Sequence, residues 1–152
     1  NFGTASILKV ITNYLATVHL VALGEAWTIA SKSNLDLNKV FKGIASSSGN
    51  SFVHETESQV ILNGSYNINF TMDLVEKDIG LFQRIASRLG VDLEIAPVIL
   101  DIIKDGKEKF GDRAWSSMIV KRLEDQFNTS FRADGFPDEL VDFEEKETGI
   151  EI

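Results

Sequence analysis

The sequence contains no cysteine, and this absence excludes several kinds of chemistry at once. Disulfides, thiolate nucleophiles and thiolate-bound zinc all require that residue. Familiar nucleotide-binding and hydrolase signatures are missing too: there is no Walker loop, no Gly-x-Ser-x-Gly, no His-Glu-x-x-His and no Gly-x-Gly-x-x-Gly after a strand. The two histidines, His19 and His54, have no matched cluster of carboxylates, so we expect no metal site.

A basic-then-apolar leader is also absent, and the apolar stretches read as shorter than the roughly 20 residues that a membrane span needs. The lack of cysteine agrees with a reducing compartment. We therefore expect a cytoplasmic protein that does not contact a membrane.

The net charge of -8 is distributed unevenly. From Ala133 to Ile152 eight acidic residues face a single lysine, which gives this segment a charge of -7 and leaves -1 for the rest. A nearly neutral body without a basic stripe argues against nucleic-acid binding and suits a small-molecule enzyme or a helical interaction domain. The tail after about Phe127, which includes this segment, also holds apolar residues such as Phe131 and Phe136, so docking on its own body or on a partner subunit is one expectation for it and a solvated tail is the other.

The spacing of apolar residues predicts helices throughout and no strand. A first helix runs to about Ala30, roughly 40 Å at 1.5 Å per residue, and Gly24 inside it predicts a close packing contact. Later helices are expected to start at Asn34 or Asp36, at Ser51, near Thr71, at Pro97 and within "GDRAWSSMIVKRLEDQF". The expected fold is all-α, with a helical domain over residues 1–127 and an acidic tail over residues 128–152.

Lys9 and Asn13 lie four residues apart in the first helix, so their side chains project from the same face. A lysine in such a place is usually a solvated charge whose stem covers apolar surface. The other interpretation is that Lys9 is a catalytic amine on a mainly apolar helix, with the Asn13 amide beside it. Spacing leaves both interpretations open.

Several short motifs, taken in order, carry a resemblance to a known family. They are Gly3-x-Ala5-x-x-x-Lys9-x-x-x-Asn13, "GEA" at 24–26, "NLDL" at 34–37, "SSSGNS" at 46–51, Phe70 eight residues before Asp78, and "GDRAWSSMIVKRLE". Together they resemble the C-terminal helical domain of the β-hydroxyacid dehydrogenases, over about residues 1–126. That family includes 3-hydroxyisobutyrate, glyoxylate/succinic semialdehyde and tartronate semialdehyde enzymes and shares its architecture with 6-phosphogluconate dehydrogenase.

The resemblance implies a helical bundle with a long first helix, joined in the whole enzyme to an N-terminal Rossmann domain that binds NAD or NADP. It implies a small 3-hydroxyacid or semialdehyde as substrate and a homodimer or higher homo-oligomer. Because this chain lacks the Rossmann domain, we expect it to be the C-terminal half of a longer enzyme and inactive alone. The alternative is a non-catalytic helical dimerisation or partner-binding module.

The resemblance also implies roles for individual residues. Lys9 would be the general acid and base, with Asn13 as a second catalytic residue. Ala5 stands where the family commonly has glycine, a small departure. The remaining expected site residues are Lys77, Asp78 and Phe70 at the cofactor, and Ser48, Gly49 and Phe52 at the substrate.

Simpler interpretations exist for four of these residues. Lys77 and Asp78 could form an exposed ion pair worth under about 1 kcal/mol. Phe70 and Phe52 could be core residues.

Overall fold

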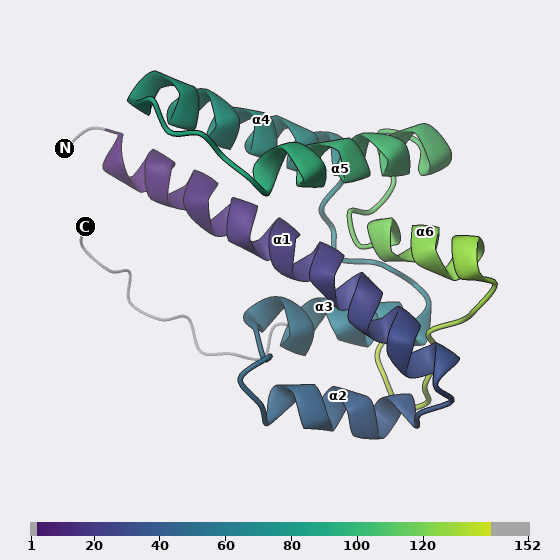
Figure 1. Ribbon diagram of the computed structural model, residues 1–152. Coiled ribbons are helices and arrows are strands. Elements are labelled where there is room, and N and C mark those ends of the chain that lie inside the picture. Colours follow the sequence, from purple (N-terminus) through teal and green to yellow (C-terminus); the bar gives the residue numbers. More distant parts are fainter. Residues whose placement is uncertain (1–2, 141–152) are drawn as a thin grey trace.

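The computed structural model describes residues 3–140, which form helices and no strand (Figure 1). The all-α fold expected from the sequence is confirmed. The helices are α1 (Thr4–Lys32), α2 (Leu37–Ala45), α3 (Phe52–Asn63), α4 (Met72–Leu89), α5 (Ala96–Phe110) and α6 (Met118–Phe127).

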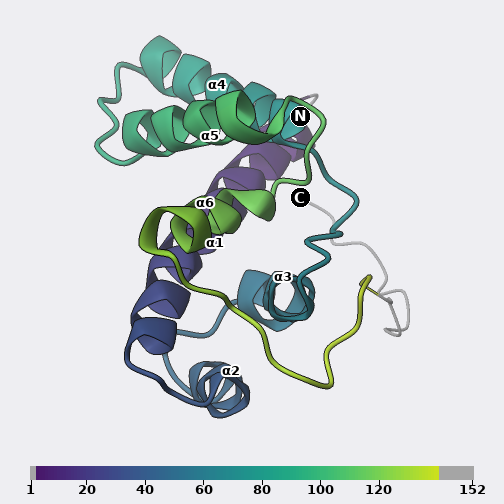
Figure 2. The same ribbon diagram turned by 90° about the vertical axis from the view of Figure 1, so that its right-hand side faces the viewer.

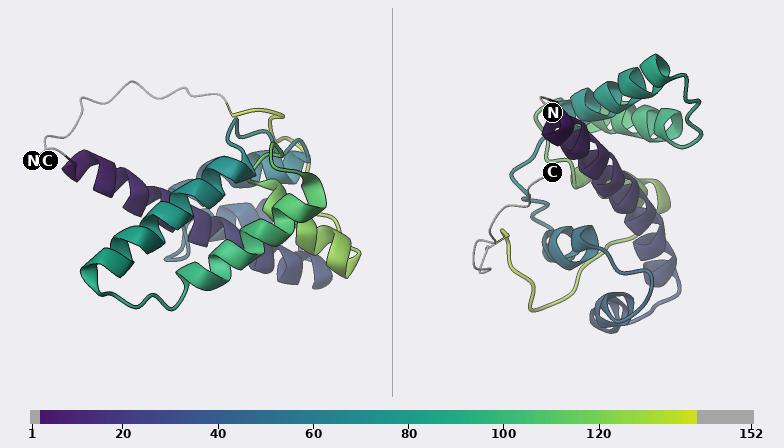
Figure 3. Two further views of the ribbon diagram at one scale, coloured as in Figure 1. Left: turned by 90° about the horizontal axis from the view of Figure 1, so that it is seen from above. Right: turned by 90° about the vertical axis from the view of Figure 1, so that its left-hand side faces the viewer.

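The long helix α1 is the centre of the arrangement and contacts all five other helices. Helices α4 and α5 form a pair on one side of it, and α2 and α3 lie on the other (Figures 1 and 2). Seen from above, the α4–α5 pair is antiparallel and crosses α1 (Figure 3).

Side-chain caps and glycines set the ends of the shorter helices. The Asp36 carboxylate accepts hydrogen bonds from the backbone N–H groups of Asn38 and Lys39, and the Ser51 hydroxyl accepts one from the N–H of His54. These caps satisfy donors that a helix start leaves free. Helix α4 ends at Gly90, which adopts the left-handed conformation that glycine allows without strain.

The close contact predicted at Gly24 is present. A Cβ atom built there would lie 3.1 Å from Leu123 Cδ1 and 3.3 Å from Val120 Cγ2. Helix α6 therefore packs almost directly on the backbone of α1, which a larger residue would prevent.

The last helix begins inside the stretch in which the sequence placed it. The segment 111–117 is a turn that forms an isolated bridge between Thr71 and Trp115, and α6 begins at Met118. The N–H groups of Met72 and Asp73 donate to the carbonyls of Ala114 and Asp112. Those carbonyls thus cap the start of α4. This contact between distant segments explains why residues 111–117 are not helical.

The acidic segment after α6 docks on its own body as far as it is described. The Phe131 side chain is completely buried in the core. The N–H of Ala133 donates to the carbonyl of Leu62, and the Phe136 ring meets the Phe41 ring edge-on with centroids 5.0 Å apart. The rest of the expected tail, residues 141–152, lies outside the described residues.

The expectation that no apolar stretch could span a membrane was wrong for α1. By length and composition alone, this helix passes as a membrane span. Between Lys9 and Glu25 this helix contains no Asp, Glu, Lys or Arg. In the structure α1 packs against the other helices as a core element, so its composition is weak support for a membrane.

Candidate functional site

A buried carboxylate joins α1 to α4 near the start of α1. Asp78 Oδ2 accepts hydrogen bonds from Lys9 Nζ at 2.7 Å and from Asn13 Nδ2 at 2.6 Å. The Asp78 side chain is 3% exposed, whereas that of Lys9 is 55% exposed. The cluster therefore has a buried acceptor and an amine that reaches the surface.

The two helices are held in register by neighbouring contacts. The rings of Tyr14 on α1 and Phe82 on α4 stack with centroids 4.0 Å apart and planes 10° apart. Each ring lies within one turn of the Asp78 cluster on its own helix. One turn further along α1, the Thr17 hydroxyl donates to the carbonyl of Asn13. The position of Lys9 relative to Asp78 is thus fixed by packing as well as by charge.

The charges around Asp78 keep it ionised. Burial raises the pKa of Asp78. The hydrogen bonds from Lys9 and Asn13 and the positive charges of Lys9 and Lys77 together lower it by more, so the pKa of Asp78 lies below its usual value. Lys77 Nζ is 3.8 Å from Asp78 Oδ1, and the Lys77 side chain is 57% exposed. More than half of the Lys77 side chain is thus open to solvent, and Lys77 is not among the residues that line the cavity described below.

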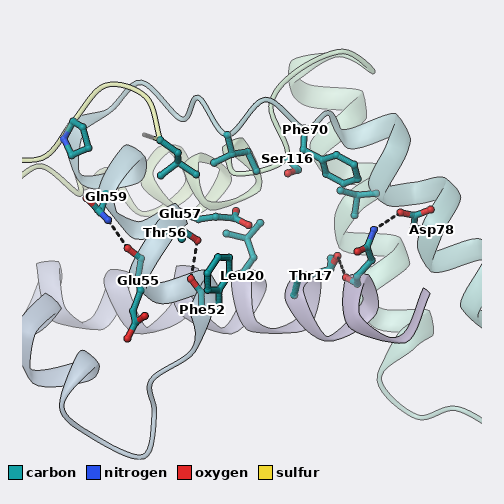
Figure 4. Close-up of a pocket in the computed structure, with 16 residues that line it drawn as sticks. Thr17, Leu20, Phe52, Glu55, Thr56, Glu57, Gln59, Phe70, Asp78 and Ser116 are labelled. Carbon is teal, nitrogen blue, oxygen red and sulfur yellow. Dashed lines mark hydrogen bonds between the residues drawn. The ribbon is translucent and has the colours of Figure 1, made fainter. Parts of the chain in front are cut away.

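A cavity of about 770 Å³ lies beside this cluster, between α1, α3 and the segment that precedes α4 (Figure 4). Asn13 and Asp78 are part of its wall, and Phe70 and Phe52 line it as well. Its volume is in the range typical of small-molecule pockets. The cavity could therefore hold a small ligand within reach of the polar cluster.

The backbone around Phe70 is fixed to the turn that precedes α6. The N–H of Ser116 donates to the Phe70 carbonyl at 2.8 Å, and the Thr71–Trp115 bridge lies next to it. Phe70 is partly buried against the core, so it packs and lines the cavity at the same time. Phe52, at the start of α3, is 71% exposed, which excludes the core role considered for it.

Ser48 and Gly49 lie elsewhere. They occupy the exposed turn between α2 and α3, and neither is among the residues that line the cavity. A substrate contact from these two residues stays a prediction.

His54, by contrast, is a core residue. It is completely buried, with Nε2 against the Phe41 carbonyl and Nδ1 against the Ser58 hydroxyl. Within residues 3–140 no group of three or more His, Asp or Glu side chains is arranged to hold a metal.

Sequence reasoning missed Glu57 and Thr17, which also line the cavity. Thr17 continues the four-residue spacing of Lys9 and Asn13, so it could have been identified as part of the same face. Glu57 lies four residues after Val53 and four before Ile61, both buried. An acid at that spacing points inward, and this signal could have been used.

The Glu57 carboxyl is the least satisfied polar group of this region. Its Oε2 atom is buried and has no hydrogen-bond partner. Burial raises the pKa of Glu57 to about 8, so the group is largely protonated at neutral pH. A neutral carboxyl of this kind offers one donor and an acceptor to the cavity.

The chain matches a sequence family described as "NAD-binding of NADP-dependent 3-hydroxyisobutyrate dehydrogenase" over residues 3–123. It is 26% identical to the L-threonate dehydrogenase of Escherichia coli K12 over 119 residues, which cover 78% of this chain and 39% of that protein. It is also 26% identical to the 2-(hydroxymethyl)glutarate dehydrogenase of Eubacterium barkeri over 129 residues, covering 84% and 43% of the two chains.

The fold is similar to that of a solved 3-hydroxyisobutyrate dehydrogenase from Salmonella typhimurium. The TM-score is 0.73 with 27% identity, and the match covers 79% of this chain and 42% of the other. The chain thus spans about two fifths of the length of the relatives that it matches.

Proposed function

Because this chain belongs to the β-hydroxyacid dehydrogenase family, we propose that it is the helical half of an NAD(P)-dependent enzyme that interconverts a small hydroxyacid and its carbonyl product. The observation that carries the proposal is the Lys9–Asn13–Asp78 cluster at the edge of a ligand-sized cavity. The alcohols are expected among 3-hydroxyacids, whose oxidation gives a semialdehyde when the hydroxyl is primary and a ketone when it is secondary.

Lys9 is the proposed general acid and base. In the oxidative direction its neutral amine accepts the proton of the substrate hydroxyl, and in the reductive direction its ammonium donates that proton to the carbonyl oxygen. A bound nicotinamide cofactor supplies the hydride chemistry. Asp78 holds the Lys9 amine at a fixed position, and Asn13 holds the shared carboxylate without adding charge.

The residues of this chain fit one edge of such a cofactor. Phe70 offers an apolar wall in the cavity, and the half-exposed Lys77 amine lies next to the cluster. We propose that both contact the nicotinamide end, and that Phe52 borders the substrate. We propose that an N-terminal Rossmann domain of the full-length protein holds the remainder of the dinucleotide, so that activity needs both domains.

The exposed apolar side chains of α1 support a second proposal about partners. Ile7, Leu8, Ile11 and Leu15 lie within three turns of one another and are each 38–46% exposed. Exposed apolar rows of this kind mark protein interfaces. We propose that the row packs against the Rossmann domain or a second subunit of a homo-oligomer in the cytoplasm.

Replacing the amine in the full-length protein tests the proposed function. Lys9→Ala should lower kcat by about 10²–10⁴-fold with its best hydroxyacid, because general acid–base catalysis contributes that much. Turnover would be measured by cofactor absorbance, against a panel of 3-hydroxyacids and semialdehydes with NAD and with NADP.

Lys104→Ala is the matched control, since that lysine is 54% exposed on α5 and forms only a 4.0 Å ion pair with Asp101. Its turnover should equal that of the parent. If Lys9→Ala retained full turnover, the catalytic assignment would be wrong. A non-catalytic module that binds partners through the apolar row of α1 would then be favoured.

A further inference from the structure

The cavity has two polar regions, and the proposed chemistry uses only one of them. In Figure 4 Asp78 lies at the α4 end, whereas Glu57 reaches from α3 into the space between α1 and the two segments that carry Phe70 and Ser116. Both carboxyl groups line the same cavity. A ligand that reacts beside Lys9 would therefore extend its other end toward Glu57.

The surroundings of Glu57 are mainly apolar. Leu20 of α1, Ile68 and Leu140 line the cavity with it. Its Oε2 atom has no partner within the described chain, although buried carboxyl oxygens are normally hydrogen-bonded. A polar group of a ligand that enters the cavity can supply the missing partner.

The charges of the cavity wall limit what that ligand group can be. Glu55, Glu57 and Asp78 are the titratable residues among the described ones that line the cavity, and none of the lining residues is a lysine or arginine. A second carboxylate on the ligand would meet acids and no cation there. An alkyl end would leave the Glu57 carboxyl unpaired. A hydroxyl group can both accept from a protonated carboxyl and donate to it.

We propose that Glu57 determines specificity by binding a second hydroxyl group of the substrate, on a carbon other than the reacting one, so that the preferred substrates are polyhydroxylated short-chain acids. This inference rests on the proposed function for the identity of the reaction. It goes beyond that function by naming the substrate class and the residue that selects it.

The test compares two acids of equal length and charge in the full-length protein. The acids are 2,3,4-trihydroxybutanoate and 2,3-dihydroxybutanoate, which lacks only the terminal hydroxyl. The parent enzyme should prefer the first by about 10-fold in kcat/KM, as expected when a buried polar group is left unpaired by the second. Glu57→Leu should abolish this preference, mainly by raising KM for the trihydroxylated acid.

Two further variants separate recognition from general damage. Glu57→Gln keeps a donor and an acceptor, so it should retain most of the preference. Glu108→Leu makes the same apolar change on the exposed face of α5 and should leave the preference unaltered. An unchanged preference in Glu57→Leu, or no preference in the parent, would overturn the inference.

A binding measurement keeps the inference testable if no hydroxyacid is turned over, or if Glu57→Leu does not fold. Glutamate labelled with ¹³C at the side-chain carboxyl would be followed by NMR in the full-length parent protein, with Glu57→Gln identifying the Glu57 resonance. The trihydroxylated acid should shift that resonance and the dihydroxylated acid should not. Equal shifts or no shifts would contradict the role of Glu57, whereas absent turnover alone would contradict only the proposed reaction.

Discussion

At Asp78 a single buried carboxylate oxygen accepts hydrogen bonds from both residues that we propose for catalysis. A lysine at the surface would ordinarily sample many rotamers, at a cost in entropy when it is fixed. Because α4 holds the Asp78 carboxylate in place, the hydrogen bond to it restricts the rotamers of Lys9. The catalytic geometry therefore depends on a residue that lies sixty-nine positions from Lys9 in the sequence.

Asp78→Asn should separate the structural part of this role from its charge. The variant should lower the free energy of unfolding at pH 7 by about 1–2 kcal/mol, because a buried acceptor loses its charge-assisted bonds while its partner Lys9 stays half-exposed. Urea denaturation followed by circular dichroism would measure the change.

The effect of Asp78→Asn should depend on pH in one direction. The pKa of Asp78 is lower in the folded protein than its ordinary value of 3.8, so its contribution is present above that value and is lost as the pH falls below it. The difference between parent and variant should shrink between pH 7 and pH 3. Asp101→Asn, at an 80% exposed side chain, should show almost no difference at either pH. A difference that grows toward acid would refute the ionised state assigned to Asp78.

The helices pack closely because glycines stand where two backbones approach. At Gly106 of α5, a Cβ atom would lie 2.5 Å from Ile119 Cδ1 of α6 and 3.2 Å from Met72 Sδ of α4. Both of these neighbours are buried, so neither side chain can move into solvent. The junction of α4, α5 and α6, which also carries the segment around Phe70, depends on that missing side chain.

Gly106→Ala and Gly80→Ala should shift stability in opposite directions. Overpacking at Gly106 should cost about 1–3 kcal/mol, partly offset by the roughly 1 kcal/mol that alanine gains in a helix. At Gly80 of α4 a Cβ atom meets only the flexible end of Arg84, at 3.4 Å, so the helix gain should remain and the protein should become more stable. Thermal unfolding of the two variants would measure this, and equal shifts would show that the contact at Gly106 is unimportant.

At the scale of the whole molecule, the segment after α6 packs against the core. Phe131 is completely buried, and its N–H donates to Glu124 Oε1 at 2.7 Å. Arg132 pairs with the same oxygen at 2.8 Å and also donates to the Tyr66 hydroxyl at 3.0 Å. Pro137 and Leu140 then pass over the cavity wall. The segment thus links the core to the candidate site.

Phe131→Ala should destabilise the chain by about 3–5 kcal/mol, the usual cost of removing a buried phenylalanine. Phe127→Ala is the control, because its side chain is 43% exposed and its loss should cost less than about 1.5 kcal/mol. Denaturation midpoints of the two variants would distinguish them. If Phe131→Ala behaved like Phe127→Ala, the segment would not be part of the core.

The sequence predicted those features that depend on local spacing. Apolar periodicity and capping residues such as Asp36 and Ser51 were enough to place helices, because their signals lie within a few residues. The exact start of the last helix could not be predicted, because the carbonyls of Asp112 and Ala114 cap α4, which is a contact with a distant segment. The sequence does not decide whether Phe131 docks on the body, because the acidic residues that follow it are typical of a solvated tail.

The candidate site shows the same division. Lys9 and Asn13 could be paired by their spacing, but Asp78 joined them only through the resemblance to a family. Glu57 was overlooked because its helix carries several polar residues, and only its alignment with Val53 and Ile61 shows that it faces inward. Contacts between helices, rather than patterns along one helix, define this cavity.

The central position of α1 has a consequence for synthesis. Its packing partner α6 and the buried ring of Phe131 are among the last parts of the described chain to leave the ribosome. Until then the nascent polypeptide carries a long apolar helix without its cover, which is the kind of surface that chaperones recognise. Folding of this body must therefore wait until the segment that contains Phe131 has left the ribosome, and a product terminated before α6 would expose α1 and be directed to aggregation or proteolysis.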